Sequence, residues 1–228
     1  MATALQEAVS MIFSKSPLLL DIIGVTLRMS LASSLAALLI GVPLGVIYGS
    51  FSFPGKRILI ILNRTLMGLP PVVCGLLCYL MFCGVGPLRH LKLLYTVKAM
   101  VIAQIILITP IVAGMLESSV SAIAPEVRET AGGLNFSKAK TMGLIINESG
   151  YQIVTAYLLG LSRALAEVGA VSMVGGAIAY KTNVMTTAIM NYTNMGDFTT
   201  ALALGIILLA LSLAVNAAVS LMQGRLRR

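Results

Sequence analysis

Charged side chains are scarce in this chain. Of its 228 residues only 11% are Asp, Glu, Lys or Arg, whereas 58% are hydrophobic, and the mean hydropathy is +0.96. Globular domains in water carry roughly a quarter charged residues. The few charges also cluster, so long stretches carry almost none. The composition excludes an ordinary soluble domain and predicts helices that cross a membrane, because backbone groups cannot stay unpaired in lipid.

Ligand and catalytic residues are also rare. His90 is the single histidine, and Cys74, Cys78 and Cys83 fall in one apolar run. We interpret these thiols as small apolar groups and expect no disulfide, metal site or cofactor, because zinc needs paired ligand spacings. Motifs of zinc peptidases and serine hydrolases do not occur, so no catalytic residue is expected. Gly55-Lys56-Arg57 lacks the first glycine and the hydroxyl of a phosphate-binding loop, so this chain should not bind ATP.

Five apolar runs are long enough to span a bilayer as helices. They cover about residues 29–51, 58–83, 99–116, 152–179 and 201–222. The fold class predicted is therefore an all-α integral membrane bundle of about five transmembrane helices, forming one domain over residues 1–228. Glu7 interrupts the first twenty residues, which do not resemble a secretory signal. Residues 2–13 could instead form a short helix at the membrane interface.

Lysine and arginine are divided unequally between the two sides that five spans create. One side holds nine: Lys56, Arg57, Arg64, Arg128, Lys138, Lys140, Arg225, Arg227 and Arg228. The other holds five: Lys15, Arg89, Lys92, Lys98 and Lys181. The positive-inside rule then predicts an amino terminus outside and a carboxyl terminus in the cytoplasm. Because the bases lie mostly at the ends of apolar runs, the net charge of +8 indicates membrane orientation and not nucleic acid.

Glycines recur at every fourth position of the first span, at Gly41, Gly45 and Gly49. Such spacing gives a helix one smooth face that another helix can approach closely. Two interpretations remain open from the sequence. The face packs against another helix of the same chain, or it lies at an interface between subunits.

The longest polar segment, residues 117–150, carries start and stop signals for two short helices. Residues 124–133 are expected to form the first, because Pro125 suits a first helical position. Gly132-Gly133 can end that helix in a left-handed conformation, and Ser137 can cap the helix that follows. A solvated loop is the alternative, but we expect two short, capped helices to form a compact surface that another protein can bind.

This segment resembles the cytoplasmic motif of permease subunits of ATP-binding-cassette importers. Glu129-Thr130-Ala131, Asn135 and Ile145 stand where that family has Glu-Ala-Ala, a glycine and an isoleucine. Thr130 and Asn135 depart from the pattern, although asparagine tolerates a left-handed turn. Asn147-Glu148 replaces the family's Leu-Pro, which leaves the end of the second helix undetermined.

Four further segments strengthen the resemblance and extend it over about residues 24–222. Ser162–Gly169 looks like the Arg-Ala-x-x-Glu-x-Gly element of oxyanion permeases. Ser52–Lys56 is similar to their first cytoplasmic turn and Gly68–Leu76 to their second span. Val174–Gly176 with Val184–Ile189 looks most like the tungstate branch, with molybdate and sulfate permeases as relatives.

The resemblance implies a multi-pass permease of a prokaryotic cell membrane that imports an oxyanion, with tungstate first and molybdate or sulfate as alternatives. It also implies a homodimer, two cytoplasmic ATP-binding subunits that hydrolyse ATP, and an extracytoplasmic oxyanion-binding protein. The residues expected to couple with the ATPase are Pro125, Glu126, Glu129, Thr130, Ala131, Gly132, Gly133, Leu134 and Asn135. A secondary transporter driven by an ion gradient is the rival class, but it would usually show internal repeats, and none is found.

Arg163 and Glu167 are the charges inside the fourth apolar run. Their spacing of four residues puts them on one helical face, and intramembrane charges are candidates for function. We favour a structural pair over an anion site, because Glu167 would repel a dianion. Transport requires weak binding along the path, which small polar residues such as Thr109, Ser172 and Thr186 could supply.

Overall fold

The computed structural model describes residues 6, 10 and 17–226, and within these every regular element is a helix. The interfacial helix expected at residues 2–13 falls almost entirely outside the described residues. The α-helices are α2 Pro17–Ser50, α3 Lys56–Met67, α4 Pro71–Phe82, α5 Val97–Gly133, α6 Lys138–Glu148, α7 Gly150–Ala166, α8 Gly169–Gly175, α9 Met185–Asn194 and α10 Phe198–Leu226. A short 3-10 helix, η1 Arg89–Leu91, lies between α4 and α5.

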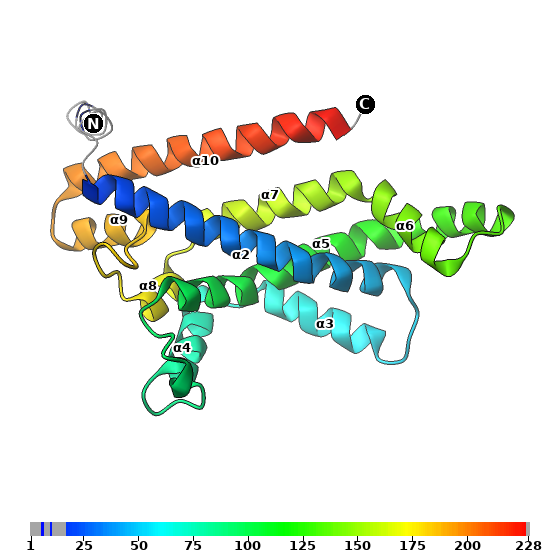
Figure 1. Cartoon of the computed structure of the whole chain (residues 1–228), viewed down its shortest axis with the longest axis horizontal. Coiled ribbons are helices and arrows are strands. Elements are labelled where there is room, and N and C mark those ends of the chain that lie inside the picture. Colours follow the sequence, from blue (N-terminus) through cyan, green and yellow to red (C-terminus); the bar gives the residue numbers. More distant parts are fainter. Residues whose placement is uncertain (1–5, 7–9, 11–16, 227–228) are drawn as a thin grey trace.

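Three helices are individually long and apolar enough to cross a membrane, namely α2, α5 and α10. Two further spans arise if each of two bent pairs counts as one, α3 with α4 at 100° and α7 with α8 at 57°. The prediction of an all-helical membrane bundle with about five spans is confirmed. The long helices run along one axis, so that the start of α2 and the end of α10 lie toward opposite ends (Figure 1).

Two helices extend beyond the apolar runs predicted as spans, because charged residues do not end them. α2 begins at Pro17, well before residue 29, and passes through Arg28. α5 continues from its apolar run to Gly133 instead of stopping near Leu116. The carboxylate of Glu117, the first charge after the run, is paired with Arg64 of α3 at 3.4 Å.

The second and fourth spans are broken where the sequence suggested single runs. α3 ends at Met67 and α4 starts at Pro71, the second of the successive prolines Pro70 and Pro71. Proline lacks a backbone N–H and disfavours the helical region for the residue before it, so two successive prolines favour a break here, although α5 continues through single prolines. The break between α7 and α8 occurs at Glu167, whose φ of −75° and ψ of 129° are extended.

The glycine face of α2 packs against α5 of the same chain. A Cβ added at Gly45 would lie 2.6 Å from the Cβ of Leu116 and 2.8 Å from the carbonyl oxygen of Ala113. At Gly41 and Gly49 the added atom would lie 2.7 Å from a valine side chain of α5. Of the two interpretations left open by the sequence, packing within the chain is therefore correct for this face.

Candidate functional site

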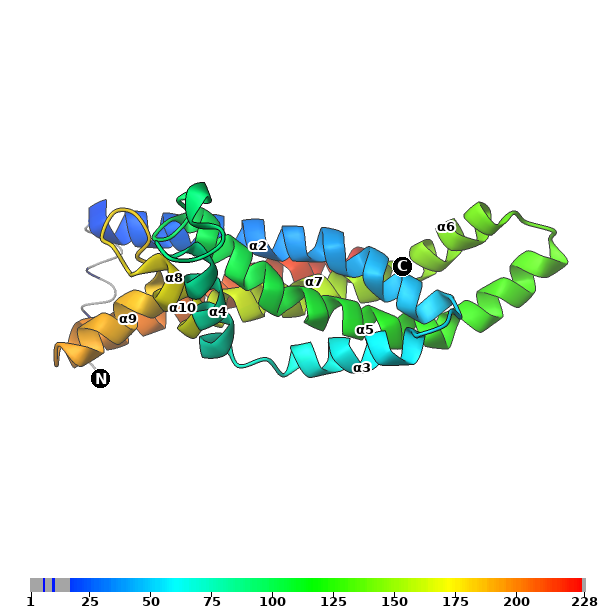
Figure 2. The same ribbon diagram turned by 90° about the horizontal axis from the view of Figure 1, so that it is seen from below.

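The segment that follows the apolar part of α5 projects beyond the other helices at one end of the bundle (Figure 2). α5 passes through Pro125 without a break, so the expectation that a separate helix starts there was wrong. Tertiary packing explains the continuity, because Val120 and Ala124 of α5 are buried with Val46 of α2 and Ile145 of α6. We call residues 117–150 the α5–α6 segment.

The turn between α5 and α6 uses Asn135 and not the glycine pair. Gly132 and Gly133 are helical, so the expected left-handed glycine cap was wrong. Asn135 adopts the left-handed conformation, with φ of 54°, as the sequence had allowed. The Ser137 hydroxyl accepts the backbone N–H of Lys140 at 3.4 Å, which confirms the predicted cap of α6.

The second helix of the segment ends where the family's proline would stand. α6 closes at Glu148, and Ser149 separates it from α7. The backbone N–H of Ser149 donates to the carbonyl of Ile145 at 3.0 Å. A terminal proline is therefore not needed to stop this helix.

Exposure divides the candidate coupling residues into two groups. Ala131 is buried by its own chain at 1% exposure, so a partner cannot reach it. The exposed members are Pro125, Glu126, Glu129, Thr130, Gly132, Gly133, Leu134 and Asn135. Among them Leu134 is a 59% exposed apolar side chain at the tip of the segment. The exposed end of α5 therefore carries one large apolar side chain among mostly polar or small residues.

Arg163 and Glu167 form the predicted ion pair, with Arg163 Nη2 lying 3.7 Å from Glu167 Oε2. They do not share a continuous helix, because Glu167 lies just beyond the end of α7. The other carboxylate oxygen of Glu167 accepts the N–H of Ala170, in the first turn of α8, at 3.1 Å. The hydroxyl of Thr186 donates to the Glu167 carbonyl at 2.8 Å. Glu167 thus joins α7, α8 and α9 at the break.

The three hydroxyl residues suggested for the transport path do not converge. Thr186 contacts the α7–α8 break, and Ser172 of α8 donates to the carbonyl of Gly169 at 3.0 Å. Thr109 instead lines a groove between α2, α3 and α5. Its buried hydroxyl has no hydrogen-bond partner within the described part of the chain.

Sequence reasoning missed a buried glutamine, Gln104, whose side chain forms hydrogen bonds between helices. Gln104 of α5 is fully buried and accepts a hydrogen bond from the Ser33 hydroxyl of α2 at 2.5 Å. Its amide nitrogen donates to the carbonyl of Ala164 in α7 at 2.9 Å. One side chain therefore ties three helices together. Its signal in the sequence was an amide inside the third apolar run, where an unpaired polar group is costly.

A second missed contact fixes α3 against α5. The Asn63 amide donates to the carbonyl of Pro110 at 3.0 Å. Together with the pair of Arg64 and Glu117, it joins the otherwise exposed α3 to the bundle. Across residues 6, 10 and 17–226, no group of three or more His, Cys, Asp or Glu side chains could hold a metal ion.

Comparisons with known proteins agree with this geometry. The family described as "Binding-protein-dependent transport system inner membrane component" matches residues 41–228. The tungstate uptake system permease protein TupB of Peptoclostridium acidaminophilum is 34% identical over 222 residues, covering 97% of each chain. A protein of Haloferax volcanii described as a probable anion ABC transporter permease is 36% identical over 204 residues, covering 87% of this chain and 88% of its own.

A chain of the inward-facing MetNI methionine ABC transporter shares the fold. It superposes with a TM-score of 0.76 at 18% identity, covering 92% of this chain and 97% of that chain. The family match spans most of the sequence, and the bent pairs of helices in the bundle lie within it. The chain therefore belongs to the family of inner-membrane components of binding-protein-dependent transport systems, as a permease component of an ABC importer.

Proposed function

We propose that this permease imports tungstate. The support is the 34% identity to a tungstate uptake permease over 97% of both chains. The resemblance of Val184–Ile189 to the tungstate branch points the same way. Molybdate and sulfate are the competing substrates, since they are also tetrahedral dianions.

The α5–α6 segment is the coupling element in this proposal. The observation that carries it is the projection of the segment beyond the bundle, with Glu126, Glu129 and Leu134 exposed at its surface. Two ATP-binding subunits, one for each permease of a homodimer, would each hold one such segment and hydrolyse ATP. A binding protein would deliver the anion at the opposite face.

Orientation follows from the bases at the projecting end. Lys56 and Arg57 start α3 near this end, and Lys138 and Lys140 belong to α6. The positive-inside rule places this end in the cytoplasm, with the start of α2 outside. A cysteine replacing Gly143 suits a labelling test, because this residue is exposed and has no neighbour within 4 Å of an added Cβ. We expect labelling only after the membrane is permeabilised; labelling in intact cells would reverse the assignment.

The charged pair has a positioning role in this scheme. Glu167 uses both carboxylate oxygens within the chain, on Arg163 and on Ala170, and would repel a dianion. Ser172 and Thr186, near the break, and Thr109, in its separate groove, remain the proposed weak polar contacts of the path.

Transport in vesicles tests the substrate and the energy source together. The permease is reconstituted with its ATP-binding subunit and binding protein, and uptake of tungstate, molybdate and sulfate is compared. We expect ATP-dependent uptake with tungstate fastest at equal low concentration. Faster uptake of sulfate or molybdate would reassign the substrate. Uptake driven by an ion gradient without ATP would overturn the mechanism.

A further inference from the structure

A pocket of about 350 Å³ lies where the end of α2 meets the turn between α5 and α6. Its lining residues are Phe51, Arg128, Gly132, Phe136, Lys138, Thr141, Met142 and Ile145. Two of them are cations and none is a carboxylate. The remaining walls are largely apolar, so the pocket combines positive charge with a hydrophobic surface.

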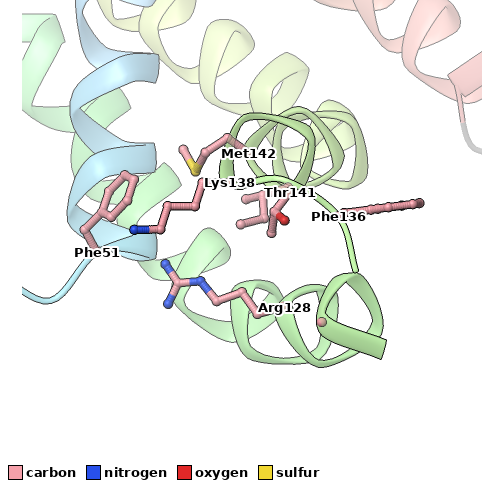
Figure 3. A pocket seen from close by; sticks show the side chains of 8 residues that line it. Phe51, Arg128, Phe136, Lys138, Thr141 and Met142 are labelled. Carbon is pink, nitrogen blue, oxygen red and sulfur yellow. The ribbon is translucent and has the colours of Figure 1, made fainter. Parts of the chain in front are cut away.

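Both cations are directed to one region of this pocket. Arg128 donates to the carbonyl of Ser50, and its guanidinium carbon lies 5.9 Å from the centre of the Phe51 ring. Figure 3 shows the amine of Lys138 and the guanidinium of Arg128 both turned toward Phe51. These contacts hold the guanidinium in place at the end of α2.

No acidic side chain balances these charges. Within the described residues, the ion pairs join Arg64 to Glu117 and Arg163 to Glu167. Both cations are exposed to solvent, so water screens part of the repulsion between them, but no carboxylate offsets it. An anion seated between them would relieve that repulsion.

We propose that this pocket binds a tetrahedral oxyanion group, and that the phosphate of an anionic phospholipid is the source that fits its walls. α2 is long and apolar enough to cross a membrane and Phe51 directly follows its last residue, so the proposal puts the pocket near a membrane surface. Basic pockets at this depth attract anionic headgroups. A free anion would neutralise the cations but leave the walls of Phe51 and Met142 uncovered.

A bound headgroup would connect two elements that carry the cations. Arg128 belongs to the last turns of α5, and Lys138 is the first residue of α6. Neutralising both would hold the turn between α5 and α6 against the end of α2. The inference concerns the pocket alone, and it stands whichever anion the permease carries.

Lipid titration of the purified full-length chain in a neutral detergent tests the site. The probe is fluorescent phosphatidylglycerol, with fluorescent phosphatidylcholine as the uncharged reference. We expect Lys138→Gln to weaken phosphatidylglycerol binding about five-fold, and Lys138→Arg to restore it. Arg128 is left intact because its side chain also donates a hydrogen bond to the carbonyl of Ser50.

Lys140→Gln is the matched control. It removes the same charge from the same helix, but the Lys140 amine lies 3.7 Å from the centre of the Phe136 ring and does not line the pocket. We expect its affinity for the probe to equal that of the wild type. Equal losses for Lys138→Gln and Lys140→Gln would show diffuse attraction and overturn the proposal.

Free anions distinguish the two sources of the same chemistry. Inorganic phosphate and tungstate are added as competitors at constant ionic strength. Displacement of the probe at millimolar or lower concentration, lost in Lys138→Gln, would support the site and assign it to the free anion. No displacement, with binding that depends on Lys138, would assign it to the lipid. If neither the lipid nor a free anion bound in a way that depends on Lys138, the proposed site would be overturned. The assay needs neither ATP nor transport, so this result is independent of the proposed transport substrate.

Discussion

Replacement of Gly45 by alanine tests the contact between α2 and α5. The added Cβ meets the Cβ of Leu116 at 2.6 Å and the carbonyl oxygen of Ala113 at 2.8 Å. A backbone oxygen cannot turn aside as a flexible side chain can. The two helices must therefore move apart by roughly 0.7 Å to restore ordinary van der Waals contact.

The size of the effect follows from two opposing terms. Alanine is better than glycine in a helix interior by about 0.8–1.0 kcal/mol. Overpacking a well-packed contact costs about 1–3 kcal/mol, and a contact with backbone on the other side lies in the upper part of that range. We expect Gly45→Ala to be destabilising by about 1–2 kcal/mol, which corresponds to a Tm lower by roughly 3–6 °C.

Gly24→Ala supplies the matched control on the same helix. No atom lies within 4 Å of a Cβ added at Gly24, so only the helix propensity changes and the Tm should stay equal or rise. The assay is thermal unfolding of both purified variants in one detergent, followed by circular dichroism or by the exposure of the buried cysteine thiols to a labelling reagent. If Gly45→Ala unfolds at or above the temperature of Gly24→Ala, the close packing described for α2 and α5 is refuted.

Three further predictions concern charged residues. Arg163→Ala and Glu167→Ala should each lower the Tm, and the double variant should lose less than the sum; strictly additive losses in this double-mutant cycle would mean that the pair does not interact. The Glu129→Arg permease should insert normally but co-purify with less of the ATP-binding subunit. Ala131→Arg should instead lower the Tm of the permease itself, because Ala131 is buried. If Glu129→Arg lowered the Tm and left co-purification unchanged, the docking surface would lie elsewhere. Hydrogen bonds from the Thr200 side chain and backbone lower the pKa of Asp197. The stability that this carboxylate contributes is therefore full above the usual pKa of aspartate and is lost as the pH falls through the lowered pKa. Asp197→Asn keeps an acceptor for the Thr200 N–H, so it should flatten the dependence of Tm on acidic pH.

The elements predicted well were those whose cause is local in the sequence. Apolar runs indicated membrane spans, because the hydrophobicity of a run is fixed by its own residues and needs no contact with the rest of the chain. Ser137 as a cap and Asn135 in a left-handed turn were also local, since each depends on one side chain and its neighbouring backbone. Pro125 misled for the opposite reason. Its preference for a first helical position was outweighed by the packing of Val120 and Ala124 on α6.

The parts that could not be predicted depend on contacts far apart in the chain. Gln104 joins α2 and α7, and nothing in the apolar run around it indicates which partners satisfy its amide. The exposed state of Glu129 and the burial of Ala131 likewise require the turn that returns α6 onto α5. Arg163 and Glu167 were predicted to pair because a spacing of four puts residues on one helical face, yet they meet at a break between helices, and that break depends on tertiary packing.

The unbroken course of α5 has a mechanical consequence. Its 37 residues from Val97 to Gly133 form a rod roughly 55 Å long. Its middle is held against the glycine face of α2 from Val112 to Val120, so this part cannot shift without separating the two helices. Toward its start, Met100 lies against Gly175 of α8. One continuous helix therefore joins the projecting α5–α6 segment to the second half of a broken span.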